Sequence, residues 1–213
     1  MTHPSSIALV GGGEHALVVA DALERLGIVV VGCWAPEAQA GLRRLGDDDA
    51  LEAAVRARDA IACPLHLAMA GRAGSATRRR VAERIEKFGP VGWASVCHPA
   101  AVVSTSAILA PGAFVAAGAI VNPRAQIGRH ALVNTGAIVE HDVVVGDGVH
   151  LCPGSVTGGG VRIGAWSVIG LGAVIRDHVS IGAGAVVGMG AIVVRTVPDG
   201  AWVIGNPARA MQR

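Results

Sequence analysis

The sequence has 213 residues, a formal net charge of +2, two Phe, four Trp and no Tyr. The scarcity of aromatic rings argues against a nucleic-acid-binding protein, because such proteins stack bases on aromatic side chains. Neither a signal peptide nor a membrane span is expected, which favours a cytoplasmic protein. No CxxC spacing occurs, so the cysteines are expected to be free thiols in a reducing compartment: Cys33, Cys63, Cys97 and Cys152.

The amino-terminal part of the chain predicts strands that alternate with helices. Apolar runs predict strands at residues 7–10, 28–31, 65–70 and 91–96, and helical periodicity predicts helices at 16–26, 50–58 and 76–88. Three aspartates, Asp47 to Asp49, are expected to cap the second helix. The order strand, glycine-rich turn, helix, strand begins a βαβ unit, so residues 1–97 are predicted to form a Rossmann-like α/β domain with a parallel sheet.

The turn after the first strand is a candidate ligand site. Its small residues precede a helix whose N-terminal N–H groups favour an anion. It is not a complete GxGxxG, and residues 33–36 after the second strand include no acidic side chain, so a dinucleotide site is disfavoured. A mononucleotide or sugar phosphate remains open, as does a tight turn without a ligand. The turn residues are Gly11, Gly12, Gly13, Glu14 and His15.

Beyond residue 98 an aliphatic residue returns at every sixth position without an insertion, with Thr157 as the one exception. This period fits neither a helix nor a hairpin meander and predicts a β-solenoid of triangular coils. Three hexads make one coil, so residues eighteen apart should stack in columns. Residues 98–213 are therefore predicted to be an all-β parallel β-helix. The inward positions are Val103, Leu109, Val115, Val121, Ile127, Val133, Val139, Val145, Leu151, Thr157, Ile163, Ile169, Ile175, Ile181, Val187 and Val193.

One segment of the repeat carries charges that folding does not require. Glu140, His141 and Asp142 follow one another at a predicted corner. Imidazole titrates near neutral pH, and an adjacent carboxylate can fix its tautomer, so His141 is a candidate general base. His150 is expected to lie on the outward side of the next coil edge. Cys152 is expected to be structural rather than nucleophilic.

Four features together resemble the two-domain bacterial sugar acetyltransferases of the hexapeptide-repeat family. They are the turn at 11–16, the unbroken hexads, the segment 139–142 and the closing segment 204–209. This family comprises N-acetyltransferases of nucleotide-linked 4-amino-sugars and proteins similar to sialic acid O-acetyltransferases. The resemblance covers nearly the whole chain. It implies a homotrimer of left-handed β-helices that uses acetyl-CoA as a cosubstrate between subunits, with no tightly bound cofactor.

The resemblance also implies roles for individual residues. His141 would be the general base and Asp142 its orienting acid, while Asn134 and His150 would hold the acetyl donor or the acceptor. Gly159 would offer its N–H to the acetyl oxygen, and the turn at 11–15 would bind the nucleotide-sugar. CoA would be contacted by Leu171, Gly172, Met189, Gly190, Asn206, Pro207, Ala208 and Arg209.

The preferred expectation is N-acetylation of GDP-perosamine. Family members that bind UDP-sugars typically carry an acidic pair after the second strand, where this chain has Ala35 and Pro36. Three alternatives stay open. They are O-acetylation of a sugar such as sialic acid, a zinc-dependent carbonic anhydrase with His141, His150 and His178 as ligands, and a scaffold without enzymatic activity. The flanking carboxylates and the closing segment argue against zinc.

Overall fold

A computed structural model describes residues 4–57, 63–71 and 76–211. The chain divides into two compact units, one that ends at Pro99 and one that begins at Ala100. This division falls two residues after the expected end of the first domain at residue 97. None of the helices in the described ranges is both long and apolar enough to cross a membrane.

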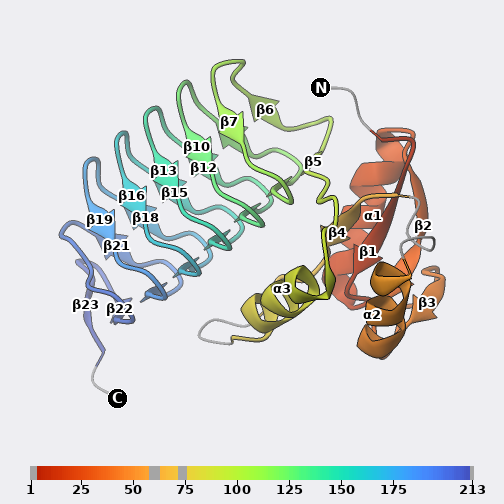
Figure 1. Cartoon of the computed structure of the whole chain (residues 1–213). Helices are drawn as coiled ribbons and strands as arrows, with labels where there is room; N and C mark the ends of the chain where they lie inside the picture. Colours follow the sequence, from red (N-terminus) through yellow and green to blue (C-terminus); the bar gives the residue numbers. More distant parts are fainter. Residues whose placement is uncertain (1–3, 58–62, 72–75, 212–213) are drawn as a thin grey trace. The chain divides into compact units, whose positions relative to one another are not determined.

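The first unit is built on a parallel sheet of four strands in the order β3-β2-β1-β4 (Figure 1). β1 is the inner strand next to β4, and its residues 7–10 are completely buried, which explains the continuous apolar run in the sequence. The elements are β1 (Ser6–Val10), α1 (Glu14–Arg25), β2 (Val29–Trp34), β3 (Arg44–Gly46), α2 (Asp48–Arg56), β4 (Leu65–Leu67) and α3 (Thr77–Phe88).

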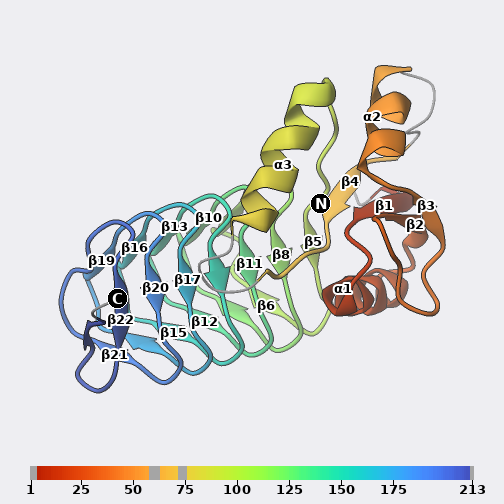
Figure 2. The same cartoon turned by 90° about the horizontal axis from the view of Figure 1, so that it is seen from below.

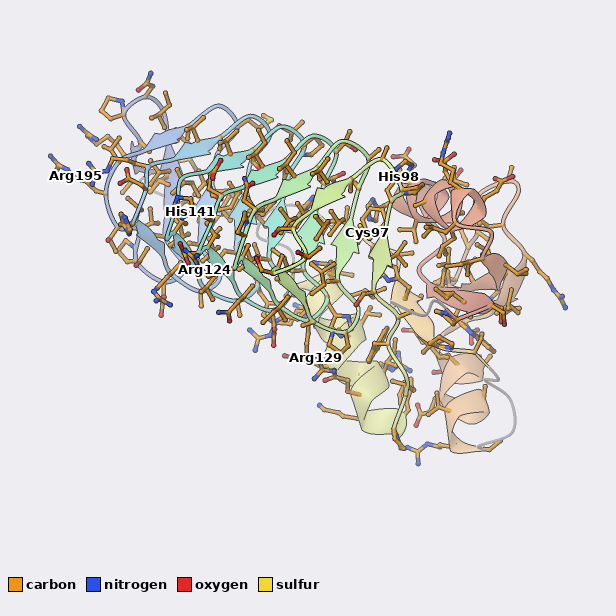
Figure 3. The ribbon with its side chains drawn as sticks, turned by 90° about the horizontal axis from the view of Figure 1, so that it is seen from above. Cys97, His98, Arg124, Arg129, His141 and Arg195 are labelled. Atoms are coloured by element: carbon orange, nitrogen blue, oxygen red, sulfur yellow. The ribbon has the colours of Figure 1, made fainter. Side chains whose placement is uncertain are left out.

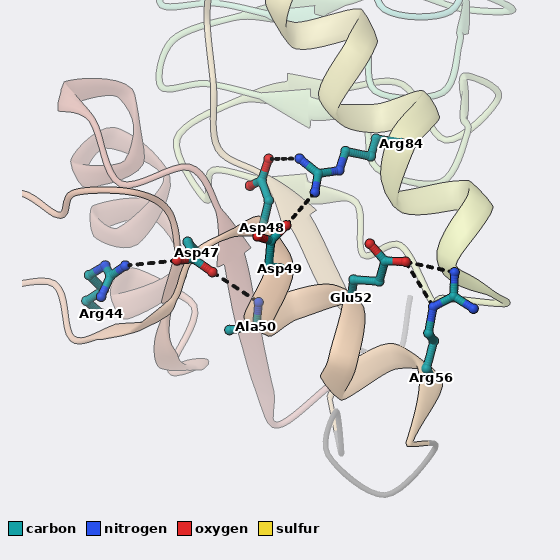
Figure 4. Close-up of polar contacts among 8 residues, drawn as sticks. All are labelled: Arg44, Asp47, Asp48, Asp49, Ala50, Glu52, Arg56 and Arg84. Atoms are coloured by element: carbon teal, nitrogen blue, oxygen red, sulfur yellow. Dashed lines mark hydrogen bonds and ion pairs between the residues drawn. The ribbon is translucent and has the colours of Figure 1, made fainter.

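The predicted aspartate cap of the second helix is present. The carboxylate of Asp47 accepts a hydrogen bond of 3.0 Å from the N–H of Ala50, at the start of α2 (Figure 4). The two following aspartates, Asp48 and Asp49, bind the guanidinium of Arg84 on α3 at 3.0 and 2.8 Å. The triple aspartate therefore both starts α2 and ties it to α3. The predicted last residue of this helix, residue 58, lies outside the described ranges.

The expected fourth strand at residues 91–96 is wrong in its extent. Only Val96–Cys97 forms a strand, β5, and Trp93 makes a single parallel bridge to Leu65. The third expected strand is also shorter, since β4 ends at Leu67. Residues 90–92, of sequence Pro-Val-Gly, break the apolar run with the two residues least suited to a strand, which explains the single bridge.

The second unit is a β-solenoid with three sheets, in which neighbouring strands of one sheet are eighteen residues apart (Figure 2). This register confirms the predicted columns. The β12 sheet contains β6 (Val102–Val103), β9 (Ile120–Val121), β12 (Ile138–Val139), β15 (Val156–Thr157), β18 (Val174–Ile175) and β21 (Ile192–Val193). The β13 sheet contains β7 (Ile108–Leu109), β10 (Gln126–Ile127), β13 (Val144–Val145), β16 (Arg162–Ile163) and β19 (Ser180–Ile181). The β14 sheet contains, within this unit, β8 (Phe114–Val115), β11 (Leu132–Val133), β14 (His150–Leu151), β17 (Val168–Ile169), β20 (Val186–Val187), β22 (Trp202–Ile204) and β23 (Arg209–Ala210).

The second residue of each strand from β8 to β21 points into the solenoid. From Val115 to Val193 every sixth residue is buried, as the repeat predicts. Thr157, the one polar residue in the series, is also completely buried. Its hydroxyl lies 3.4 Å from the carbonyl of Ile138 and 3.4 Å from the N–H of Glu140, so it is paired with backbone rather than orphaned.

The outward faces of the three sheets differ. The outward residues of the β13 sheet are mostly polar or small, whereas every outward residue of the β12 sheet is aliphatic, with Val102 at 65% and Val174 at 39% exposure. A continuous aliphatic column facing outward is typical of a protein interface. The column consists of Val102, Ile120, Ile138, Val156, Val174 and Ile192.

Two serines at equivalent positions, each two residues before an inward residue, should respond in opposite ways to alanine. The buried hydroxyl of Ser155 has no hydrogen-bond partner among the described residues, whereas that of Ser167 lies 2.6 Å from Gly182 O and 2.8 Å from Gly164 O. We expect Ser155→Ala to raise the free energy of unfolding by about 1 kcal/mol and Ser167→Ala to lower it by about 1–2 kcal/mol. Urea midpoints at one fixed protein concentration measure both changes. Equal shifts in the same direction would contradict this assignment.

Candidate functional site

The charged segment of the repeat forms a tight turn between β12 and β13. Figure 3 labels His141 on the solenoid. Its Nδ1 lies 2.8 Å from Oδ2 of Asp142, and its side chain is 57% exposed. The carboxylate of Glu140 accepts the N–H of His141 at 3.3 Å. With Nδ1 occupied by the carboxylate, Nε2 is the nitrogen left to accept a proton, as a general base requires.

An arginine from the preceding coil completes this corner. Arg124 binds both carboxylate oxygens of Asp142, with Nε–Oδ1 and Nη2–Oδ2 distances of 2.6 Å. These hydrogen bonds, followed by the one from His141, hold the pKa of Asp142 well below its usual range. The sequence prediction did not include Arg124. The eighteen-residue column would have found it, because Arg124 lies one coil before Asp142.

Gly159 lies against the imidazole, one coil after His141. A Cβ built on Gly159 would lie 2.7 Å from both Cε1 and Nε2 of His141, so only glycine leaves room for this ring position. The carbonyl of Gly159 accepts the N–H of His178 at 2.9 Å, while its own N–H donates to no acceptor in the described part of the chain. A backbone donor is thus available beside the candidate base.

Replacing Gly159 with alanine should therefore displace the imidazole without damaging the coil. Ala117, Ala165 and Ala183 occupy the equivalent position in other turns, so the backbone tolerates this residue. Because alanine keeps the N–H, we expect Gly159→Ala to lower kcat by about 10- to 100-fold through the misplaced ring alone. Steady-state kinetics with a thermal melt measures this change. A wild-type kcat in a folded variant would contradict the contact.

Asn134 and His150 lie together, at the other end of β12 from His141. Nδ2 of Asn134 is 3.2 Å from Nε2 of His150, and Oδ1 of Asn134 accepts the N–H of Thr135 at 2.8 Å. Because Oδ1 accepts from Thr135, the amide nitrogen of Asn134 faces His150 and donates to Nε2. Asn134 belongs to the corner between β11 and β12, whereas His141 belongs to the corner between β12 and β13. Within one chain, His141 therefore lies at one end of β12, and Asn134 with His150 lies at the other.

Four of the residues expected to contact CoA, Leu171, Gly172, Met189 and Gly190, form a row at the corner between the β14 and β12 sheets. Leu171 and Met189 are stacked eighteen residues apart and are 50% and 76% exposed. Gly172 and Gly190 follow them with φ angles of +63° and +65°, a conformation suited to glycine. The closing segment lies beside β21, since the N–H of Ala208 donates to Ile192 O at 2.8 Å, and it contains the remaining expected residues, Asn206, Pro207 and Arg209.

The glycine turn of the first unit is packed on one side and open on the other. A Cβ on Gly11 would lie 2.5 Å from Cγ of Met69, and one on Gly12 would collide with the carbonyl of Glu37. A Cβ on Gly13, by contrast, would meet no atom within 4 Å. Gly13 is also the N-cap of α1 and caps it with no side chain. In the described part of the chain, the N–H groups of Gly13 and Glu14, at the start of α1, donate to no acceptor.

Behind this turn lie two imidazoles and a guanidinium. Burial, together with the neighbouring His66 and Arg78, lowers the pKa of His15 to about 4. Burial likewise lowers the pKa of His66 to about 4 and that of Arg78 to about 10. At neutral pH both imidazoles are uncharged and Arg78 is a cation. A positive charge near the N-terminus of α1 suits an anionic ligand.

The other candidate chemistries find less support in the described residues. There, no group of three or more His, Cys, Asp or Glu side chains is arranged as a metal site. His178 stands two coils after Asp142 in the same corner column, with its ring against Gly160, and His150 lies on a different sheet. Cys152 is buried, and burial raises the pKa of its thiol to about 11, which opposes a nucleophilic role.

Comparisons with known proteins agree with this fold. The family profile "Bacterial transferase hexapeptide (six repeats)" matches residues 124–159. A search of curated protein sequences gave no match. Among solved structures, the H141N mutant of perosamine N-acetyltransferase from Caulobacter crescentus, in complex with CoA and GDP-perosamine, is 34% identical with a TM-score of 0.88. The alignment covers 98% of this chain and 97% of that one.

Two further solved structures extend the comparison. The acetyltransferase domain of PglB from Neisseria gonorrhoeae is 31% identical with a TM-score of 0.86, over 98% of this chain and 100% of that chain. WeeI from Acinetobacter baumannii is 26% identical with a TM-score of 0.79, over 96% and 99%. The similarity spans both units and exceeds 30% identity in two of the three proteins. The chain belongs to the bacterial hexapeptide-repeat acetyltransferases, in the family that includes perosamine N-acetyltransferase and the acetyltransferase domain of PglB.

Proposed function

We propose that the protein transfers the acetyl group of acetyl-CoA to the amino group of a nucleotide-linked 4-amino-sugar, with GDP-perosamine preferred. One observation carries this proposal: the imidazole of His141, held by Asp142, lies against Gly159, whose N–H is available. A general base next to a hydrogen-bond donor for an oxyanion is the arrangement that acyl transfer needs. The CoA and GDP-perosamine complexes of the Caulobacter enzyme support the same classes of donor and acceptor.

The proposed reaction is a direct attack of the sugar amine on the thioester. Nε2 of His141 takes a proton from the amine, directly or through a water molecule, as the nitrogen adds to the acetyl carbonyl. The N–H of Gly159 stabilises the negative oxygen. Collapse of this intermediate forms the amide and breaks the C–S bond, and the departing sulfur takes the proton from His141, so that CoA leaves as its thiol. No covalent enzyme intermediate is required, in keeping with the raised pKa of the Cys152 thiol.

We propose a homotrimer with shared sites, which is supported by the division of the site residues within one chain. His141 stands at one end of β12, and Asn134 with His150 stands at the other. Between them runs the outward aliphatic column of the β12 sheet, a surface suited to burial against a second copy. Packing two copies on these columns can bring the His141 corner of one chain to the Asn134 corner of the next. Cyclic assembly then completes each site with residues of two chains.

The preference for a guanine nucleotide rests on the end of β2. Ala35 follows this strand, and its carbonyl accepts the Nε–H of Arg44 at 2.8 Å. A guanidinium therefore stands where an acidic pair is typical of members that bind UDP-sugars. The open N–H groups at Gly13, with the Arg78 cation nearby, supply a place for the diphosphate. The solved complex with GDP-perosamine supports the same choice.

The deciding experiment supplies acetyl-CoA with a panel of acceptors and measures the release of the CoA thiol. The panel contains a GDP-linked 4-amino-sugar, a UDP-linked 4-amino-sugar and sialic acid as a hydroxyl acceptor. We expect the highest kcat/KM with the GDP-linked amine and an amide in the product by mass spectrometry. Thiol release with sialic acid alone would replace N-acetylation by O-acetylation, and release with no acceptor would overturn the proposal.

A further inference from the structure

At the corner between the β12 and β13 sheets, Arg124, Asp142 and His178 have left-handed φ angles and only Gly160 is glycine, whereas another corner has glycine throughout. Arg124 and Asp142, one coil apart, have left-handed φ angles of +61° and are not glycine. At the corner between the β14 and β12 sheets, the equivalent residues are all glycines with φ between +63° and +67°: Gly118, Gly136, Gly154, Gly172 and Gly190. Left-handed backbone is strained for residues other than glycine, and such strain tends to cluster at functional sites.

Stabilisation of the fold by the ion pair between Arg124 and Asp142 does not explain why these two positions keep a strained backbone conformation. The side chains are 68% and 41% exposed, and exposed ion pairs stabilise a fold very little. The contacts of Asp142 instead indicate a role in holding His141. Oδ2 of Asp142 is shared, since it lies 2.6 Å from Nη2 of Arg124 and 2.8 Å from Nδ1 of His141. The bidentate contact fixes the plane of the carboxylate that orients the imidazole.

We infer that Arg124 is a positioning residue that acts through Asp142: it holds the imidazole of His141 in place and offsets the charge of the carboxylate beside it. This inference rests on the proposed function of His141 as the base. The bidentate contact with Arg124 holds the carboxylate of Asp142, which keeps Nδ1 of His141 occupied and Nε2 against Gly159. The guanidinium charge also offsets the carboxylate charge. Loss of the guanidinium would therefore leave the carboxylate charge unopposed beside the imidazole.

The other groups around the imidazole do not replace this charge. Glu140 is the only other adjacent ionisable neighbour in the turn, and it adds a second negative charge. The following coil presents Gly159 and Gly160, which carry no charge. The next coil carries Arg176, Asp177 and His178, beyond those glycines. In the described part of the chain, Arg124 is thus the one cation in contact with the His141–Asp142 pair.

The test replaces Arg124 by Gly, which relieves the backbone strain, and by Lys, which keeps the positive charge but cannot make the bidentate contact with Asp142. For Arg124→Gly we expect kcat to fall about threefold to tenfold, a small part of the contribution of a general base. The acid limb of the pH dependence of kcat/KM should move to higher pH by about 0.5–1 unit at low salt. This shift should shrink in 1 M salt. Arg124→Lys should keep the limb near its original position with an intermediate kcat.

Titration of the His141 imidazole by NMR gives a second readout that needs no turnover. Its midpoint should move upward in Arg124→Gly and stay in place in Arg129→Ala, which removes a guanidinium from another turn (Figure 3). An unchanged midpoint and acid limb in folded Arg124→Gly would overturn the inference, even if its melting temperature fell. If Arg124→Gly does not fold, Arg124→Gln carries the same test. A protein that acetylates no acceptor would instead count against the proposed function, and the NMR result would still decide the role of Arg124.

Discussion

Replacing His141 with Asn is expected to lower kcat by about 10²- to 10⁴-fold, the usual contribution of a general base. Asn cannot accept a proton near neutral pH, but its amide can still donate a hydrogen bond to the carboxylate of Asp142. The KM values for acetyl-CoA and for the amine should change little, because the proton transfer matters in the transition state and not in the bound ground state. The side chain is 57% exposed, so the melting temperature should be retained.

The matched control is His178→Asn. This histidine stands in the same corner column with φ of +58°, a backbone conformation that Asn adopts readily. We expect kcat to stay within about twofold of wild type, since a surface change outside the reacting groups has a small effect. A large loss in both variants, with about one zinc per chain, would support the zinc alternative. Full activity of His141→Asn would remove the general base from the proposal.

The solenoid could be predicted from the sequence almost residue by residue. The hexad fixes which side chain points inward, and the eighteen-residue column fixes the strand register, because both follow from one period. The first unit was less predictable at its edges. Residues 91–96 contain an apolar run, yet Pro90 and Gly92 leave a single bridge at Trp93. The hand of the coil is not contained in the period at all, so only the resemblance suggested it.

The candidate site was predicted in part, for a similar reason. Charged residues are unusual in a repeat of aliphatic residues, so His141 and Asp142 could be predicted as site residues from the sequence alone. Arg124 could not, because an isolated arginine at a turn is an ordinary surface residue until its column partner is considered. The sequence also does not show directly that Asn134 and His141 are separated in the fold. Two residues seven apart are close in sequence, but a strand between two corners places them at opposite ends of one face.

Mixed trimers should recover activity when the two halves of the site are damaged in different chains. In the proposed trimer each site draws His141 from one chain and His150 from its neighbour. His141→Asn and His150→Ala are each expected to be nearly inactive alone. If the two chains are co-expressed in equal amounts and assemble at random, both intact histidines should occur in about one quarter of all sites and in about one third of the sites of trimers that contain both chains. Purification through two different affinity tags, followed by the thiol-release assay, measures this recovery.

The control pairs His141→Asn with Asp142→Asn. These residues are neighbours in one turn, joined by a hydrogen bond of 2.8 Å, so both lesions fall on the same side of any shared site. A site that draws both residues from one chain is never intact in such mixtures, and no recovery is expected. Recovery with His150→Ala but not with Asp142→Asn would therefore assign the base and its carboxylate to one chain and His150 to the next. Absence of recovery in both pairs would contradict a shared site, because the hybrid trimers would contain every residue that the proposal requires.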